Sequence, residues 1–138
     1  MRVERNVLEW RQVASANLAG GGAIVVPAGP ARSFAGAVKG RACGELSGII
    51  NSPSIVPAIQ WLNLEFTPIG TPIKLLPGTN AWTAQQFYPF DTTTPWQAID
   101  ANGANNYLMG RPVYLVSSGT TGVIAMAGVM SVIEIMYQ

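Results

Sequence analysis

The sequence predicts an all-β fold, a single-domain β-sandwich with jelly-roll or Greek-key connections. Fifteen glycines and ten prolines divide the 138 residues into segments that are too short for long helices. The segments between them are rich in Val, Ile, Thr, Trp and Tyr, which favour strands. Eight to ten short antiparallel strands at this spacing are typical of a sandwich.

The first half of the chain contains four expected strands and a stop. The strands are expected at residues 7–16, 23–26, 32–39 and 45–50. Gly20, Gly21 and Gly22 separate the first two strands. Pro53 ends this part of the pattern, because proline lacks the N–H that a strand ladder needs and restricts the residue before it.

The middle of the chain begins with the clearest strand, at residues 59–66. There Leu62, Leu64 and Phe66 form an apolar face that alternates with a mixed face containing Glu65. Shorter strands are expected at 73–76, 82–87 and 96–99. The segments 91–95 and 100–106 are expected to be loops, and the Asn-Gly pair in the second suits positive φ.

Two strands, at 113–117 and 123–137, are expected to close the chain. Residues 112–133 carry no charge and are long enough to cross a bilayer. A turn sequence at 117–122 would break a membrane helix, so two strands joined by a turn explain this stretch better.

The last strand has an informative pattern of side chains. An extended backbone places Val129, Ile133, Ile135 and Tyr137 on one face and Glu134 on the other. Gly128 is interpreted as a bulge. A helix over 122–137 is the alternative, but the segment has many β-branched residues and no cap signal.

Charged residues are scarce. They make up 11% of the chain, against about 25% in typical proteins, and the net charge is +1. Copies of such a protein repel one another little, so we expect self-association or burial in a larger assembly. The alternative is a free monomer whose surface is covered by uncharged polar residues.

The residues that most enzymes use are missing or isolated. The chain has no histidine and one cysteine, and its carboxylates show no glycosidase spacing. We therefore expect no enzyme, with no catalytic residue, no metal and no cofactor. Cys43 is expected to be a small buried core residue, and a lone cysteine fits a reducing cytoplasm. The open alternatives are a hydrolase with a distant acid pair and a calcium site at Asp91 or in the loop 100–106.

The N-terminus concentrates charge without becoming basic. Its charged residues alternate in sign: Arg2, Glu4, Arg5, Glu9 and Arg11. They leave no basic face for nucleic acid and no apolar core for a signal peptide, so neither a nucleic-acid nor a membrane partner is expected. A second basic group, Arg32, Lys39 and Arg41, is interpreted as a solvated strand edge.

Aromatic residues suggest one recognition surface. Trp82, Phe87, Tyr88 and Trp96 lie in a region rich in Pro, Thr and Gln. They could stack sugar rings on an exposed platform or anchor a neighbouring subunit. Core packing is the alternative, because aromatic side chains dominate small β cores.

Four short stretches carry a resemblance to known families. They are Glu9-Trp10-Arg11 and residues 16–22, 44–48 and 111–119. With the strand rhythm over most of the chain, they resemble the small β-sandwich head-decoration, or cement, proteins of tailed bacteriophages. The closing strands are also similar to the end of single jelly-roll capsid proteins of small icosahedral viruses. Those shells often carry a basic arm that meets RNA, and the mixed Arg/Glu segment departs from that pattern, which favours the decoration family.

The resemblance implies a non-enzymatic structural protein of a virion, assembled in the host cytoplasm. Several copies, commonly a homotrimer, would bind the major capsid protein on the outer face of a phage head and stabilise it. Residues 1–11 are expected to form a charged arm or first edge segment that contacts the shell, and residues 12–138 the sandwich domain. A jelly-roll shell protein and a carbohydrate-binding module are the alternatives.

Overall fold

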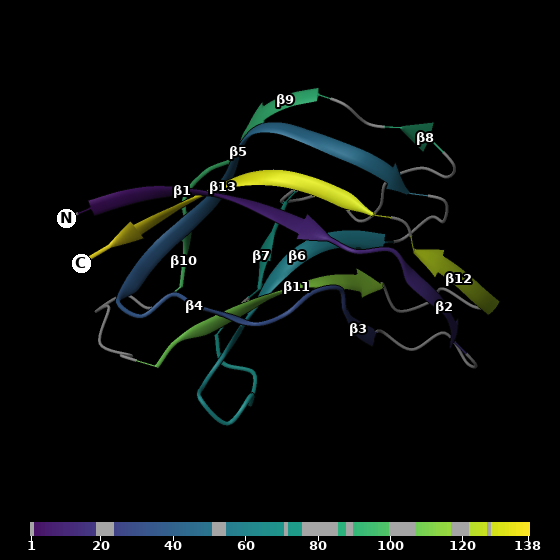
Figure 1. Cartoon of the computed structure of the whole chain (residues 1–138), viewed down its shortest axis with the longest axis horizontal. Helices are drawn as coiled ribbons and strands as arrows, with labels where there is room; N and C mark the ends of the chain where they lie inside the picture. The colour runs from purple at the N-terminus through teal and green to yellow at the C-terminus, as the bar shows by residue number, and fades with distance from the viewer. Residues whose placement is uncertain are drawn as a thin grey trace.

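The computed structural model describes residues 2–18, 24–50, 55–70, 72–75, 86–87, 90–99, 107–116, 122–126 and 128–138. Every regular element in these residues is a strand (Figure 1). In chain order the strands are β1 (Arg2–Trp10), β2 (Val13–Leu18), β3 (Ile24–Pro27), β4 (Arg32–Ser33), β5 (Ala37–Ile50), β6 (Ile55–Leu62), β7 (Ile73–Lys74), β8 (Gln86–Phe87), β9 (Phe90–Thr93), β10 (Gln97–Ala98), β11 (Met109–Val116), β12 (Gly122–Met126) and β13 (Val129–Tyr137).

Among the described residues, the strands form two antiparallel sheets and a short ribbon. The first sheet has the order β1-β13-β5-β10, and β8 and β9 also pair with β5. The second sheet has the order β3-β11-β6-β7, and β4 also pairs with β11. β2 and β12 pair with each other beyond the ends of β1 and β13 (Figure 1). The sheets face each other across a common core, so the fold is a β-sandwich.

The pairing follows an antiparallel ribbon rolled up from its two ends. The outermost segments of the chain pair with each other, β1 with β13 and β2 with β12. Moving inward along the chain, β3 and β4 pair with β11, and β5 pairs with β8, β9 and β10. The innermost pair is β6 with β7. Two further pairings, β13 with β5 and β11 with β6, close the sheets. This winding defines a jelly roll, which confirms the predicted fold class.

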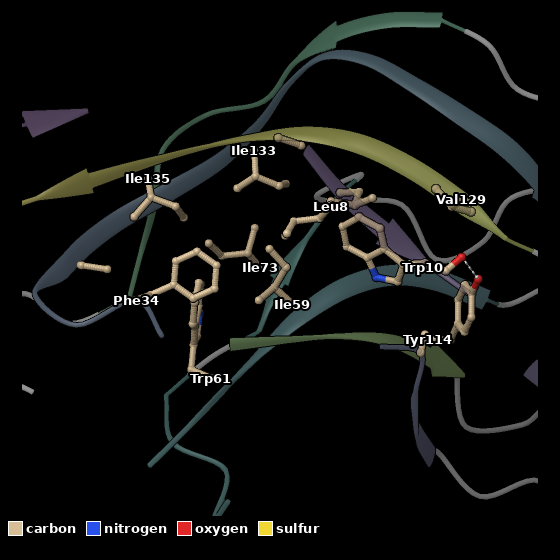
Figure 2. Packing of buried hydrophobic residues seen from close by; sticks show 14 of the residues in the cluster. Leu8, Trp10, Phe34, Ile59, Trp61, Ile73, Tyr114, Val129, Ile133 and Ile135 are labelled. Atoms are coloured by element: carbon tan, nitrogen blue, oxygen red, sulfur yellow. Dashed lines mark hydrogen bonds between the residues drawn. The ribbon is translucent and has the colours of Figure 1, made fainter. Parts of the chain in front are cut away.

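The core is filled from both sheets (Figure 2). The largest fully buried side chains are those of Trp10, Trp61, Tyr114, Ile55, Ile59, Ile73, Leu75, Leu108 and Ile133. The rings of Phe34 and Trp61 meet edge to face, with centroids 5.5 Å apart at 88°. The predicted inner face of the last strand is confirmed, because Val129, Ile133, Ile135 and Tyr137 are all buried.

A buried polar contact joins the two sheets at Trp10. Its indole Nε1 donates to the carbonyl oxygens of Ala58 in β6 (2.8 Å) and Val113 in β11 (3.1 Å). The hydroxyl of Tyr114 lies 3.2 Å from the carbonyl oxygen of Trp10 and 3.0 Å from that of Arg11 (Figure 2). Burial raises the pKa of Tyr114, so this hydroxyl keeps its proton and acts as a donor. The end of β1 is thereby fixed to the second sheet.

The first predicted strand is divided in two by this contact. Residues 7–16 were expected to be continuous, but the chain leaves β1 at Trp10 and enters β2 at Val13. Between the two strands the N–H of Arg11 donates to the carbonyl oxygen of Ala28 (2.8 Å). β1 pairs with β13, whereas β2 pairs with β12. The expected single strand is therefore two strands with different partners.

The strand expected at 59–66 runs instead from 55 to 62 as β6, and its predicted apolar face is wrong beyond Leu62. Asn63 ends the strand, because its Oδ1 accepts the N–H groups of Glu65 and Thr67, both at 2.9 Å. Phe66 adopts a left-handed φ of 62° in the resulting turn. Leu64 and Phe66 are therefore exposed, at 59% and 56%.

Other boundaries also differ from prediction. The segment 91–95, expected to be a loop, contains most of β9, which pairs with β5, and the strand expected at 123–137 is divided into β12 and β13. The segment 32–39 contains β4 and the start of β5, separated by a turn at Gly36 with φ of 83°, and the strand expected at 45–50 is the second half of β5. Gly128 lies at the break before β13 rather than in a bulge. A Cβ there would lie 3.3 Å from the carbonyl oxygen of Trp10, so the close approach of β1 explains this glycine.

We predict that Trp10→Phe destabilises the fold more than Trp61→Phe. Both indoles are buried, but the Nε1 of Trp61 has no hydrogen-bond partner among the described residues. Trp10→Phe removes a donor to two buried carbonyls, at a cost of about 1 to 3 kcal/mol beyond the loss of packing. Urea unfolding of both variants measures the difference. Equal losses would show that the contact does not hold the sheets together.

Candidate functional site: the outer face of the first sheet

The first sheet turns one face to the core and the other outward. Along β13, the buried residues alternate with Met130, Val132, Glu134 and Met136, which point away from the core. Strand pairing sets further residues beside them: Val3 opposite Met136, Arg5 and Arg41 opposite Glu134, and Val7 opposite Val132. The same pairing sets Glu9 opposite Met130 and Lys39 opposite Met136. We call this set the outer face: Val3, Arg5, Val7, Glu9, Lys39, Arg41, Met130, Val132, Glu134 and Met136.

Three charged residues meet at the centre of the outer face. The Nε of Arg5 lies 3.1 Å from Oε2 of Glu134, and the Nη2 of Arg41 lies 2.9 Å from Oε1. The Nε of Arg41 donates to the same Oε1 at 2.9 Å. Only 11% of the Glu134 side chain is exposed, although it points away from the core. The two arginines cover the carboxylate, so the cluster presents little free negative charge.

The arginines determine the protonation state of this carboxylate. Burial would raise the pKa of Glu134, but hydrogen bonds from Arg41, Arg5 and Cys43 outweigh it, and the net effect lowers the pKa. Burial and the negative charge of Glu134 raise the pKa of the Cys43 thiol. Cys43 is buried, as predicted, and its raised pKa keeps it in the weakly nucleophilic thiol form.

An aromatic ring borders the cluster. The guanidinium carbon of Arg41 lies 4.3 Å from the ring centroid of Trp96, a cation–π contact that occupies one face of the ring. Trp96 is half-buried. Arg41 and Lys39 were expected on a solvated strand edge, but β5 lies inside its sheet, between β13 and β10, so that expectation is wrong for both residues.

Apolar side chains surround the charged cluster. Val3, Val7 and Met130 are exposed at 48%, 62% and 48%. The outer face therefore combines exposed hydrophobic residues with a carboxylate paired to two arginines, and exposed apolar patches of this kind are typical of protein–protein contact surfaces.

The N-terminal residues singled out from the sequence separate in the structure. Arg5 joins the outer face, whereas Arg2 pairs with Glu4 (Nε to Oε1, 3.2 Å) and lies 4.7 Å from the ring centroid of Tyr137. Glu9 and Arg11 lie at the far end of β1, where they line shallow cavities. Residues 2–10 are already paired with β13 along their whole length. Their contact with a shell stays a prediction.

The predicted aromatic surface is only partly described. Trp96 borders the outer face, and Phe87 lies in β8 opposite Ile49 of β5. Trp82 and Tyr88 lie outside the described residues. Sequence reasoning missed Glu134 as a site residue. A single carboxylate in an apolar strand was the available signal, but its partners are 93 and 129 positions away.

The described residues contain neither a metal-binding cluster nor a membrane-spanning helix. No group of three or more His, Cys, Asp or Glu residues there could hold a metal ion. The same part of the chain contains no helix that is long and apolar enough to span a bilayer.

Comparison with known proteins identifies structural neighbours but no sequence relatives. The chain matches no protein-family model and no curated protein. A crystal structure of the infectious bursal disease virus VP2 subviral particle is similar to it with a TM-score of 0.57 and 14% identity. The structure of the Gx strain of that virus is similar with a TM-score of 0.50 and 16% identity. Each alignment covers 99% of this chain and 33% of the other, so this chain spans about a third of its neighbours' length. At these identities the similarity shows a shared fold.

We predict that Glu134→Gln lowers the free energy of unfolding at neutral pH by about 1 to 3 kcal/mol, because it removes the charge that both arginines bind. A lowered pKa in the folded state stabilises the fold above the unfolded pKa of about 4.3 and loses that effect as the pH falls through the folded value. The difference between wild type and variant should therefore shrink below about pH 4.

Urea unfolding at several pH values provides the test, with Glu65→Gln as the matched control. Glu65 is exposed in the turn after β6, so its substitution should change stability by less than about 0.5 kcal/mol. A Glu134→Gln effect that persists unchanged in acid would contradict the ionic interpretation.

Proposed function

We propose that this protein is a structural, non-enzymatic component of a viral capsid, acting through the outer face. The observation that carries this proposal is the exposed group Val3, Val7 and Met130 around an ion cluster in which two arginines pair with the carboxylate of Glu134. Burying such a face removes apolar surface from water while the carboxylate keeps both of its arginine partners. The jelly-roll topology and the similarity of fold to viral capsid structures support the proposal.

In its finer form, the proposal is a decoration, or cement, protein of a phage head. Homotrimers would bind the major capsid protein on the outside of a preformed shell, so that contacts of modest affinity add up over many copies. The charge pattern of β1 supports this role over that of a genome-facing shell protein. Arg2 and Arg5 are paired with Glu4 and Glu134, which leaves few cations of β1 to neutralise phosphates.

Point substitutions on the outer face test an assembly contact better than a deletion of the N-terminal residues. Deleting the N-terminal residues would remove β1 and the buried Leu8 and Trp10, so it would test folding rather than binding. Substitutions at exposed positions avoid this difficulty. Val7 and Met130 are suitable because their side chains contribute to the outer face and not to the core.

We predict that Val7→Asp and Met130→Asp each reduce binding to shells at least about tenfold, because each places an unpaired carboxylate in an apolar contact. The protein would be mixed with shells of the major capsid protein of the encoding virus, and bound copies counted after sedimentation. Val25→Asp is the control, since Val25 is exposed on β3 of the second sheet. Chemical denaturation checks that all three variants fold.

Expression of the chain alone separates the two capsid roles. Electron microscopy should show no closed shells if the protein decorates, and closed shells if it is a shell protein. Light scattering gives the mass of the free protein, with a trimer expected. A folded protein that neither self-associates nor binds shells would contradict both roles.

A further inference from the structure

A groove runs beside the free edge of β1, where the two sheets meet at the margin of the sandwich. Its volume is about 210 Å³, and it is lined by Arg11 and Arg32 together with Val7, Leu8, Pro30 and Pro112. A neighbouring cavity of about 530 Å³ shares Arg11 and Pro30 and adds Arg111. We call the two together the edge groove.

Three arginines from distant parts of the chain gather in the edge groove. None of Arg11, Arg32 and Arg111 forms an ion pair among the described residues. Arg32 donates from Nη2 to Oδ1 of Asn6 at 3.3 Å, and Arg111 from Nε to the carbonyl oxygen of Gly29 at 3.4 Å. Each guanidinium has five N–H donors, so these long hydrogen bonds leave most of them available to a ligand. Glu9 also lines the groove, and the arginines outnumber it.

The backbone beside the groove is also available. β1 is the end strand of its sheet, and in the described residues it pairs only with β13. It is nine residues long and contains no proline. Every second backbone N–H and C=O along such an edge points away from the sheet, where another strand can pair with it.

We propose that the edge groove binds an extended acidic segment of a partner protein, added as a strand to β1. The segment's backbone pairs with the free edge, and its carboxylates meet Arg11, Arg32 and Arg111 through charge-assisted hydrogen bonds. Alternate side chains of the segment rest on Val7 and Pro30, which are the exposed apolar residues of the lining. The proposal does not rest on the capsid role proposed above, although Val7 belongs to both surfaces.

The lining of the groove favours a peptide over a nucleic acid. Glu9 lines the groove together with Arg11 and Arg32 and would repel a chain with a phosphate at every position. A peptide can place an uncharged residue there and carboxylates elsewhere. The apolar floor and the strand edge also match alternating side chains and a peptide backbone, which a nucleic acid does not offer.

Fluorescence polarisation of the full chain with a labelled octapeptide, Val-Asp-Val-Glu-Val-Asp-Val-Glu, tests the proposal. The comparison probes are the same peptide with lysine in place of each acid, an N-methylated acidic peptide that cannot pair as a strand, and a single-stranded oligonucleotide. Arg11→Gln and Arg32→Gln remove groove cations. Lys74→Gln, in β7, removes a cation outside the groove.

We expect the acidic octapeptide to bind, more weakly as salt is added, and the other three probes to bind at least tenfold more weakly. Arg11→Gln and Arg32→Gln should each weaken binding about three- to tenfold, and Lys74→Gln should leave it unchanged. Hydrogen exchange on the wild-type protein should show slower exchange of β1 amides when peptide is bound. This measurement needs no variant to fold.

Three results would overturn the proposal. The first is that the acidic octapeptide does not bind, or binds no better than the lysine peptide. The second is that binding occurs without protection of β1 amides or without an effect of the arginine substitutions, which would place the peptide elsewhere. The third is that the oligonucleotide binds more tightly, which would make the groove a nucleic-acid site.

Discussion

The contact between Trp10 and the second sheet determines how β1 is placed. The indole N–H bridges two buried carbonyls, and the hydroxyl of Tyr114 returns a hydrogen bond to the backbone where β1 ends. Buried polar groups of this kind cost free energy unless they are paired, so the two sheets fit together in few ways. The position of β1 then fixes the partner of β2, the outer face and the edge groove.

Because charged residues are scarce, a single ion cluster largely determines the charge at the centre of the outer face. Glu134 is the only carboxylate in β13, and Arg5 and Arg41 bind it from the strands on either side. The pairing leaves no free carboxylate in the cluster between the exposed valines and a methionine. The exposed apolar side chains favour burial against another subunit, because burial removes them from water. That burial does not require either arginine to separate from Glu134.

Two surfaces of different chemistry flank β1. The outer face combines exposed apolar side chains with a paired ion cluster, whereas the edge groove is lined by arginines without an ion pair among the described residues and offers unpaired backbone groups. A protein with two such surfaces on one strand can contact two partners, or two parts of one partner, at the same time. Simultaneous contacts raise overall affinity through effective concentration, which suits a protein without a deep binding site.

The amino-acid sequence alone determined the strand content, the sandwich class, the inner face of β13 and the lack of histidine chemistry. Each follows from composition or from alternation between residues a few positions apart, which strand geometry converts directly into faces. Sequence patterns did not reveal the break after Trp10 or the turn at Asn63. In both places side-chain hydrogen bonds override the propensity of neighbouring residues to continue a strand.

Only the tertiary structure decided which charged residues act together. Glu134 meets partners 93 and 129 positions away, and the edge groove combines Arg11, Arg32 and Arg111. Such groupings depend on the register between strands that the winding of the jelly roll brings side by side. Local sequence patterns do not specify that register, because it is set by packing and hydrogen bonding between distant segments of the chain.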